Sequence, residues 1–282
     1  MDLQDAVELA STAIGRPVRV APTSSGGDHR SWWVERTHVL RCASNAEGSD
    51  RLHREVQLRQ FLRDRTAVLA PRSAGSGTWR GLAWTLDERL AGEPVDEAAP
   101  GPAGAVDSDL VGVMAALRGA AEEEGIVRGL PSLALPDLPT LVGNAERACR
   151  ALGLDSAASW LVGPGARAST EGPRIDRQVL VHGDLKGEHL LVAGGRLSGV
   201  LDWADAGRGP ASLDVEGLAV SLGGPRAMTV ASAAGTPDAE IDRGLLLARC
   251  RTSLRLSALV RGEPSGPEPL LRRQWTLAWM AT

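Results

Sequence analysis

Several residue types are rare or absent in this chain of 282 residues: there is no Tyr, one Phe, one Lys and three Cys. Every basic residue except Lys186 is therefore an Arg. Tyr, Phe and Lys have AT-rich codons, so a GC-rich coding sequence explains their scarcity without reference to function. The three cysteines are odd in number and lack metal-ligand spacing, which argues against a disulfide framework and a thiolate metal site. We expect reduced, half-buried thiols.

Long apolar and long basic runs are missing as well. No segment approaches the roughly 18 apolar residues of a membrane span. The stretch Met1–Glu8 carries acids where a secretory signal carries bases. We therefore expect a cytoplasmic protein that does not enter a membrane. The net charge is −4 without a basic block, which argues against nucleic acid as the main partner. Mild acidity suits a cationic small substrate.

The first part of the chain has the pattern of a small β-rich lobe. Apolar spacing predicts a helix over 2–14, and a Ser-Asp pair at 49–50 is expected to begin a second helix that ends near 65. Strand-forming segments alternate with turns, which indicates an antiparallel meander. The expected strands are 18–20, 32–35, 37–41 and 82–86, with a glycine loop at 24–31, a loop at 71–77 and a turn at 79–81.

The residue composition changes after the segment near 87–92, where the chain crosses between the predicted lobes. An Ala/Leu-rich region with helical periodicity extends to about 162 and is interrupted by prolines, and 163–173 has the composition of a flexible connection. Downstream we expect a strand at 178–181 and helices at 214–222, 239–261 and 269–281. The length suits two lobes. We predict a nucleotide-binding lobe over 1–92 with a hinge at 87–92, and a helical lobe over 93–282 with a catalytic hairpin at 178–205.

The most informative stretch is 180–205, where polar residues end short apolar runs. Asp184, His189 and Asp202 occupy these positions. Strands hold side chains rigidly, so polar groups at their ends can face a common point. A carboxylate, a second ligand five residues later and another carboxylate after a turn form a plausible metal–phosphate site. We therefore expect Asp184 and Asp202 to face a shared cation.

At this level of detail the residues match a known family. The motifs are His182-Gly183-Asp184-Leu185, then Val200-Leu201-Asp202-Trp203, then Gly207-Arg208-Gly209-Pro210 followed by Leu213-Asp214. The chain resembles the aminoglycoside phosphotransferase and choline-kinase-like family, which shares its architecture with protein kinases. The resemblance is strong around the hairpin and diffuse from about 95 to 175. It implies an α+β, two-lobed kinase-like fold, with a small antiparallel β lobe and a larger helical lobe.

The resemblance implies roles for the hairpin residues. Asp184 would be the catalytic base in an in-line transfer, and Asp202 would bind the Mg²⁺ that bridges the nucleotide phosphates. His189 stands where the family usually has Asn, and it either ligates the metal or hydrogen-bonds the Asp184 loop. Lys186 either touches the transferred phosphate or is a solvated lysine.

Other candidates lie in the predicted nucleotide lobe. Arg41 takes the place of the usual kinase lysine. Glu55 falls on the apolar face of its predicted helix, where a carboxylate needs a partner, and a buried pair with Arg41 supplies one. The glycine loop either covers phosphates or is a plain hairpin turn, because it lacks the GxGxxG pattern. The remaining nucleotide-binding candidates are Ser25, Gly26 and Gly27 in that loop, and Asp87, Glu88 and Arg89 at the lobe crossing.

A further set of acids lies near the hairpin in sequence. They either line an acidic pocket for a polycationic substrate or are ordinary surface and helix N-terminal acids. Asp214 also resembles a position that braces the catalytic loop. The set is Glu188, Asp205, Asp214 and Glu216.

The leading functional hypothesis is an antibiotic O-phosphotransferase that uses ATP or GTP and Mg²⁺. Its substrate would be a cationic antibiotic, either an aminoglycoside or a basic peptide of the capreomycin or viomycin type, and its activity would confer resistance. One alternative is a kinase of a small metabolite such as a sugar, amino alcohol or homoserine-like compound. Another is a nucleotide-binding pseudokinase. We expect a monomer or weak dimer.

Overall fold

The computed structural model describes residues 1–23, 29–97, 103–120, 125–171, 178–264 and 266–280. The chain divides into two compact units, of which the first is Met1–Gly92 with Ser198–Ala204 and the second is Glu93–Leu197 with Asp205–Thr282. The assignment of nucleotide binding and catalysis to separate lobes stays a prediction. All three cysteines are free, as expected, but fully buried rather than half-buried. Among the described helices, none combines the length and apolar character needed to cross a membrane.

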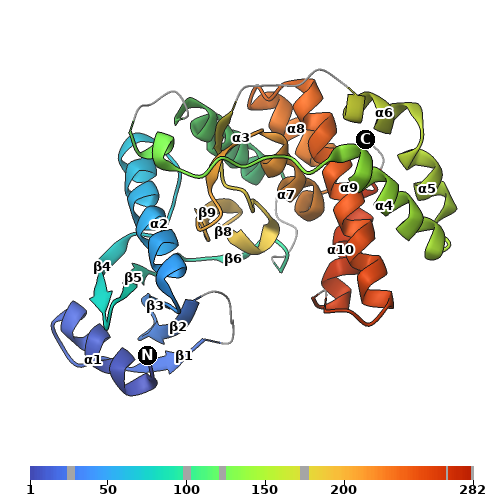
Figure 1. The fold of residues 1–282 in the computed structure, drawn as a ribbon. Coiled ribbons are helices and arrows are strands. Elements are labelled where there is room, and N and C mark those ends of the chain that lie inside the picture. Colours follow the sequence, from blue (N-terminus) through green and yellow to red (C-terminus); the bar gives the residue numbers. More distant parts are fainter. Residues whose placement is uncertain (24–28, 98–102, 121–124, 172–177, 265, 281–282) are drawn as a thin grey trace. The chain divides into compact units, whose positions relative to one another are not determined.

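A five-stranded antiparallel sheet forms the centre of the first unit (Figure 1). Leu40 and Leu86 face each other on neighbouring strands, and both are fully buried. The predicted meander is confirmed, with the strand order β1-β2-β3-β5-β4. The strands are β1 (Val20–Pro22), β2 (His29–Val34), β3 (His38–Ala43), β4 (Ser73–Trp79) and β5 (Leu82–Glu88).

Strand β4 corrects the prediction of a loop at 71–77. Its glycines made the segment read as irregular, but they accommodate the side chain of Trp84 on the paired strand β5. A Cβ on Gly77 would lie 3.1 Å from the indole nitrogen of Trp84, and one on Gly75 would lie 3.4 Å from its ring. The sequence does not show that the Trp84 ring packs on the glycines of the neighbouring strand. For that reason the glycines indicated a turn, although in the structure they allow close packing.

Two helices accompany this sheet, α1 (Leu3–Ile14) and α2 (Ala46–Arg65). Helix α1 begins at a reciprocal capping box between Asp2 and Asp5, and it packs against β1 and β4. Helix α2 packs against β3 and β5 (Figure 1). Its cap is Asn45, whose side chain accepts the N–H of Gly48, so the helix begins before the predicted 49–50.

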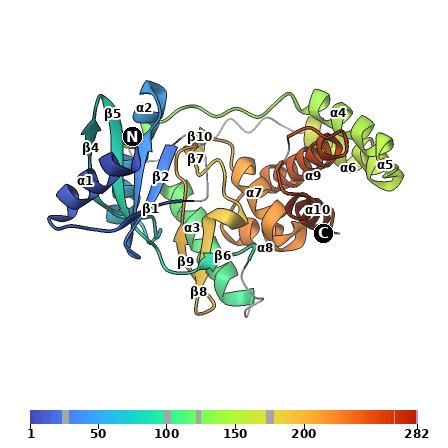
Figure 2. The same cartoon turned by 90° about the horizontal axis from the view of Figure 1, so that it is seen from below.

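The second unit is mainly helical. Its longest helix, α9 (Asp238–Val260), packs against α4, α7 and α10 (Figure 2). The other helices are α3 (Ala103–Ala120), α4 (Leu138–Ala151), α5 (Asp155–Leu161), α6 (Pro164–Glu171), α7 (Ser212–Leu222), α8 (Gly224–Ala233) and α10 (Glu268–Ala278), with short 3-10 turns η1 (Ile126–Gly129) and η2 (Gly187–His189).

Helices α6 and α8 were not expected from the sequence. Helix α6 lies where the composition indicated a flexible connection over 163–173, and it begins at Pro164, a residue favoured in the first helical turn. Helix α8 begins within a Gly-Gly-Pro sequence, residues 223–225, that favours a turn. Gly223 has φ +89° and Pro225 then lies in the first turn of the helix. In both cases a proline lies in the first turn of the helix.

Short strands in the second unit position the loop that carries Asp184. Strand β7 (Val179–Val181) pairs antiparallel with β10 (Gly207–Gly209). Strand β6 (Glu93–Pro94) pairs with β8 (Leu190–Ala193) in a sheet that also contains β9 (Arg196–Val200). The loop over residues 182–189 therefore starts and ends on strands.

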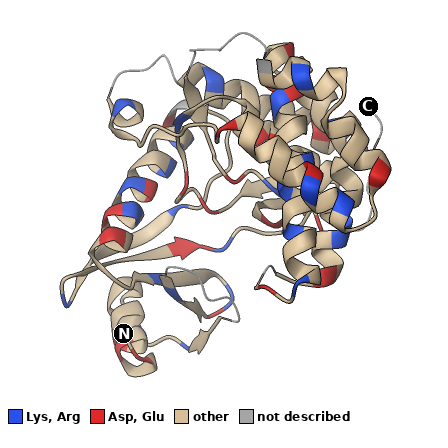
Figure 3. Cartoon of the chain, turned by 45° about the vertical axis from the view of Figure 1, so that its right-hand side comes forward, with Lys and Arg blue, Asp and Glu red and all other residues tan. Residues whose placement is uncertain are grey.

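Charges of both signs are interspersed along the exposed helices, as α2 shows (Figure 3). Pairs one turn apart join Arg51 to Glu47 at 3.2 Å and Arg272 to Glu268 at 2.7 Å. Such exposed pairs contribute only tenths of a kcal/mol each, roughly.

Candidate active site

The backbone of the loop over 182–189 is clamped by Asp214 of α7. The two carboxylate oxygens of Asp214 accept the N–H groups of His182 and Gly183, each at 2.9 Å. Asp214 is only 3% exposed. A carboxylate that binds two consecutive amides fixes the orientation of the peptide planes just before Asp184, so the following side chain starts from a fixed backbone.

Helix α7 holds the next part of the loop through close approach and one hydroxyl. A Cβ on Gly217 of α7 would lie 2.3 Å from the carbonyl oxygen of Leu185, so only glycine allows this contact. Ser221, one turn later, accepts the N–H of Gly187 at 2.6 Å. The loop is therefore fixed at several points along its length by one helix.

Asp184 projects from this loop with 34% of its side chain exposed. The ammonium of Lys186 lies 3.0 Å from Asp184 Oδ2 and 2.6 Å from Glu188 Oε1. Burial opposes the charge of Lys186, but the two carboxylates outweigh burial and raise the pKa of this lysine above its usual value. The only lysine of the chain is thus a fixed cation between two acids.

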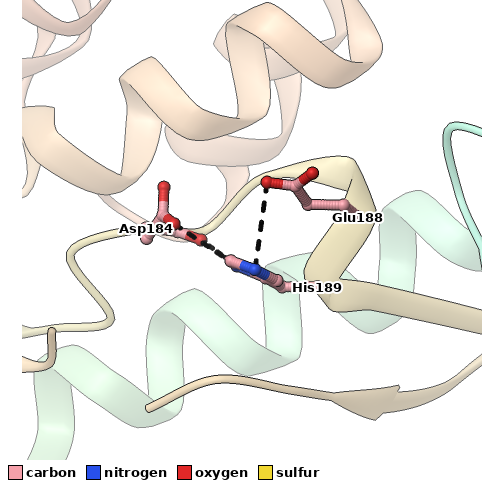
Figure 4. A group of neighbouring side chains, drawn as sticks. All are labelled: Asp184, Glu188 and His189. Atoms are coloured by element: carbon pink, nitrogen blue, oxygen red, sulfur yellow. Dashed lines mark hydrogen bonds and ion pairs between the residues drawn. The ribbon is translucent and has the colours of Figure 1, made fainter. Parts of the chain in front are cut away.

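His189 contacts the same group (Figure 4). Its Nδ1 lies 2.9 Å from the carbonyl oxygen of Asp184, and because a carbonyl only accepts, Nδ1 must carry the proton in this bond. The other nitrogen, Nε2, lies 4.0 Å from Glu188 Oε1. The hydrogen bond to the Asp184 loop, one of the two predicted roles, is confirmed.

The same geometry is compatible with the second role. Ligand atoms of Asp184, Glu188 and His189 lie within 4.8 Å of one another (Figure 4). A histidine that donates Nδ1–H to a carbonyl presents a neutral Nε2, which is the usual arrangement of a metal-binding histidine. Carboxylate oxygens suit Mg²⁺ and imidazole suits it less well. The residues therefore fit a divalent cation, and ligation by His189 stays a prediction.

Asp202 belongs to the first unit and has an unusual backbone. Its φ is +57°, in the left-handed region that residues other than glycine seldom adopt. The next residue, Trp203, is buried and donates its indole N–H to the carbonyl of Val200 at 2.9 Å, which secures the chain beside Asp202. Strain held at an exposed carboxylate is a feature of functional sites.

Four charges form a closed ring in the first unit, three of them buried and the fourth, Arg41, partly exposed. Arg41 donates to Glu55 at 2.8 Å and to Asp87 at 3.0 Å. Arg59 donates to Asp87 at 2.9 Å and lies 3.6 Å from Glu55. The predicted pair of Arg41 and Glu55 is present. Arg59 was missed, although its position four residues after Glu55 on α2 was a signal for pairing.

Asp87 was predicted to lie at the lobe crossing, where backbone groups would hold the purine, and that role stays a prediction; its carboxylate lies in this ring. It is 4% exposed and also accepts the hydroxyls of Ser73 at 2.6 Å and Thr85 at 3.0 Å. A carboxylate with both oxygens occupied in this way is a structural anchor for Arg41. No sequence pattern indicated that the end of β5 would point into the charge cluster.

The ring keeps its members ionised. Burial alone would raise the pKa of Glu55, but Arg41 and Arg59 outweigh it and lower that pKa. Burial alone would lower the pKa of Arg41, but Glu55 and Asp87 raise it, and Asp202 adds to the effect. Since Asp202 acts on Arg41, the strained carboxylate and this guanidinium lie in the same part of the first unit.

The family of this chain follows from its similarity to known proteins. The sequence profile of the phosphotransferase enzyme family matches residues 19–258, which is most of the chain. The chain belongs to the phosphotransferase enzyme family. It is a kinase-type phosphotransferase that acts on hydroxyl groups. No curated protein sequence matches it.

Solved phosphotransferase structures share the fold over nearly full length. A GDP complex of aminoglycoside 2'-phosphotransferase-IIIa is 20% identical with a TM-score of 0.71, covering 99% of this chain and 97% of that chain. A spectinomycin phosphotransferase with ADP and spectinomycin is 12% identical with a TM-score of 0.68, covering 98% and 94%. The macrolide 2'-phosphotransferase apoenzyme from Brachybacterium faecium is 19% identical with a TM-score of 0.60, covering 99% of both. The predicted two-lobed, kinase-like fold class is confirmed.

The other residues predicted to bind nucleotide in this phosphotransferase are those at the lobe crossing and in the glycine loop. The backbone N–H of Glu88 is donated to Arg72 and that of Arg89 to Thr37, each at 2.7 Å, so these two donors are already used within the first unit. The Arg89 guanidinium stacks over the Trp33 ring at 4.9 Å. Purine binding at this crossing stays a prediction. Ser25, Gly26 and Gly27 lie outside the described residues.

The predicted substrate acids differ in their surroundings. Glu188 is 43% exposed, and Asp205 is exposed with its carbonyl oxygen 2.4 Å from where a Cβ of Gly183 would lie. Glu216 is mostly buried and ion-paired with Arg251 at 2.7 Å. The buried Asp214 binds loop amides, as its resemblance to a bracing residue implied. Two of the four acids therefore face solvent beside the loop, and their substrate role stays a prediction.

The burial of Asp214, which clamps the loop, should make the stability of the protein depend on pH. Burial raises its pKa to about 7, although the His182 and Gly183 amides oppose this. The folded state therefore holds this proton between about pH 4 and 7 and the unfolded state does not. The free energy of unfolding should fall over that interval by up to about 4 kcal/mol from this group. Asp214→Asn should flatten the slope, as measured by urea unfolding at pH 5 and pH 7.5. Equal slopes for both proteins would contradict this assignment.

The strained Asp202 gives a second prediction. Glycine tolerates a positive φ and alanine does not, so Asp202→Gly should be more stable than Asp202→Ala by about 1 kcal/mol. Both variants lack the carboxylate and should lose phosphate transfer. Thermal unfolding and a transfer assay on the two proteins check this. A glycine variant that retains transfer would show that the carboxylate has no role.

Proposed function

We propose that this phosphotransferase is an antibiotic O-phosphotransferase, which transfers the γ-phosphate of a nucleoside triphosphate to a hydroxyl of a cationic antibiotic and thereby confers resistance. One observation carries this proposal: Asp184 stands partly exposed on a clamped loop, flanked by exposed acids. The solved structures of similar fold support it, since their complexes contain GDP or ADP and, in one case, spectinomycin.

Asp184 is the proposed base. It accepts or orients the proton of the substrate hydroxyl, which then attacks the γ-phosphate in line with the leaving group. The clamp by Asp214 supports this role, because a base must be within hydrogen-bond reach of the hydroxyl and must stay there. Lys186, held 3.0 Å from Asp184, is proposed to contact the transferred phosphate.

Arg41 is the proposed phosphate contact on the nucleotide side. Its guanidinium has five N–H donors, of which the ring engages those directed at Glu55 and Asp87. Among the described residues the guanidinium has no other ion-pair partner, so its other donors are proposed to bind phosphate oxygens, while the ring fixes the plane of the group. ATP and GTP both satisfy this arrangement. Ser25, Gly26 and Gly27 are proposed to cover the phosphates.

A bound Mg²⁺ would be held by Asp202 and by Nε2 of His189, and it would neutralise negative charge on the nucleotide phosphates. Glu188 is near enough to His189 to contribute a ligand. Asp202 is exposed and its charge acts on Arg41, which suits a residue that works at the same phosphates as that guanidinium.

The charge around the loop favours a cationic acceptor. Asp184, Glu188 and Asp205 carry three negative charges at exposed or half-exposed positions, and Lys186 neutralises one of them. Amines on an aminoglycoside or a basic peptide antibiotic would be attracted to this surface and would bring a hydroxyl to Asp184.

The test is a screen of purified protein with ATP or GTP, Mg²⁺ and a panel of acceptors. The panel contains aminoglycosides, capreomycin- and viomycin-type peptides, and neutral sugars, amino alcohols and homoserine. Mass spectrometry should show a gain of one phosphate on a cationic antibiotic, and expression in a sensitive host should raise resistance to the same compound. Transfer confined to a metabolite, without resistance, would replace this function by metabolite phosphorylation.

A further inference from the structure

A buried carboxylate that no role above uses follows strand β6. Asp96 has 8% of its side chain exposed, and among the described residues neither of its oxygens has a hydrogen-bond partner. Its nearest cation is Arg273 of α10, 3.5 Å from Oδ1, which also donates to the backbone carbonyl of Asp96. A buried charge with so little compensation is costly, so its location needs a reason.

The carboxylate lies against Gly187, between Lys186 and Glu188 of the loop. A Cβ on Gly187 would lie 2.5 Å from both Cγ and Oδ1 of Asp96, and its three nearest atoms all belong to Asp96. Gly187 does not have a positive φ, so its backbone does not require glycine. The missing side chain at 187 is therefore explained by the approach of Asp96.

Backbone hydrogen bonds fix this approach. The N–H of Val95 lies 3.0 Å from the carbonyl oxygen of Gly187 and 2.8 Å from that of Leu190, so the chain next to Asp96 is bonded to the first residue of η2 and to the first residue of β8. Burial raises the pKa of Asp96, and the charges of Arg273, Glu188, Glu97 and Lys186 act on it as well. Asp96 thus belongs electrostatically to the group around the single lysine.

We propose that Asp96 is a positioning residue for the catalytic turn: its carboxylate packs on Gly187, and through this contact and its charge it helps to keep the ammonium of Lys186 between Asp184 and Glu188. The proposal rests on the proposed roles of Asp184 and Lys186 in transfer. It adds a residue that touches neither nucleotide nor acceptor. Arg273 links the same carboxylate to helix α10.

The unique lysine provides a direct probe of this arrangement. Lysine labelled with ¹³C at the ε position gives one side-chain NMR signal, that of Lys186, without substrate or nucleotide. Gly187→Ala should shift this signal in the otherwise unchanged protein, because the new methyl group must displace Asp96. In an Asp96→Ala background the same substitution should cause no further shift. An equal shift in both backgrounds would overturn the packing contact.

Two further variants test the charge and do not depend on whether Gly187→Ala folds. Asp96→Asn keeps the shape of the side chain and removes the charge, and Glu97→Gln removes an exposed charge from the next residue. Asp96→Asn should shift the Lys186 signal and lower kcat on the order of tenfold with little change in nucleotide KM, whereas Glu97→Gln should resemble the unmodified protein. Identical behaviour of the two variants would overturn the proposal.

The NMR signal of Lys186 and the acceptor screen test the positioning role and the proposed function separately. If Gly187→Ala shifts the Lys186 signal only when Asp96 is present, and the protein phosphorylates no antibiotic, the positioning role holds and the proposed function fails. If an antibiotic is phosphorylated but substitutions of Asp96 leave the NMR signal of Lys186 unchanged, the proposed function holds and the positioning role fails.

Discussion

Asp184→Asn should lower phosphate transfer by about 10²–10⁴-fold and leave the protein folded. The amide keeps the size of the carboxylate but cannot accept a proton from the substrate hydroxyl. Asp184 is 34% exposed, and its clamp is made by the side chain of Asp214 on preceding amides, so the loop should keep its conformation. Steady-state transfer and thermal unfolding of the same preparation measure the two effects.

The control for this variant is Asp155→Asn, which removes an exposed carboxylate from helix α5. It should match the unmodified protein in both assays. Nucleotide affinity, measured by equilibrium binding, should also be nearly unchanged in Asp184→Asn. A variant that keeps normal kcat would remove Asp184 from the chemistry and leave the loop without a proposed base.

Arg59→Met should reduce the free energy of unfolding by about 3–5 kcal/mol. It leaves Glu55 and Asp87, both buried, with Arg41 as their only remaining partner in the ring. Methionine fills much of the same volume, so the loss reports the charge and not a cavity. Urea unfolding followed by circular dichroism measures it.

A double-mutant cycle tests whether the ring acts as a unit. Asp87→Asn alone leaves an excess positive charge, but Arg59→Met with Asp87→Asn restores a balanced pair of Arg41 and Glu55. The double variant should therefore be more stable than the sum of the single losses, with a coupling of about 0.5–3 kcal/mol. Strict additivity would show that the four charges are independent.

The site could be predicted from the sequence where its residues are local. That Glu55 needs a partner followed from a carboxylate on an apolar helix face, and the family resemblance implied Arg41 as that partner. Asp184, Lys186, Glu188 and His189 are near one another because they lie on one loop. Arg59 and Asp87 could not be placed with them, because the ring closes only when α2 packs on β3 and β5. Side-chain contacts between distant elements leave no periodic signal.

The role of Asp96 illustrates the same limit. In the sequence it is an ordinary acid after a Gly-Glu-Pro-Val turn, and Gly187 is an ordinary loop glycine. Only the pairing of β6 with β8 brings them together. Asp214 is the opposite case, because a bracing role was implied by family resemblance, and the two amide hydrogen bonds then showed how it braces.

We infer direct in-line transfer from nucleotide to hydroxyl, with Asp184 as a base and not as a nucleophile. The stereochemical course at phosphorus distinguishes these two roles, using a nucleoside triphosphate made chiral at the γ-position with oxygen isotopes and the acceptor identified by the screen. A single in-line displacement predicts inversion of configuration in the phosphorylated product. Retention would require two displacements through a phosphorylated enzyme and would exclude Asp184 as a simple base.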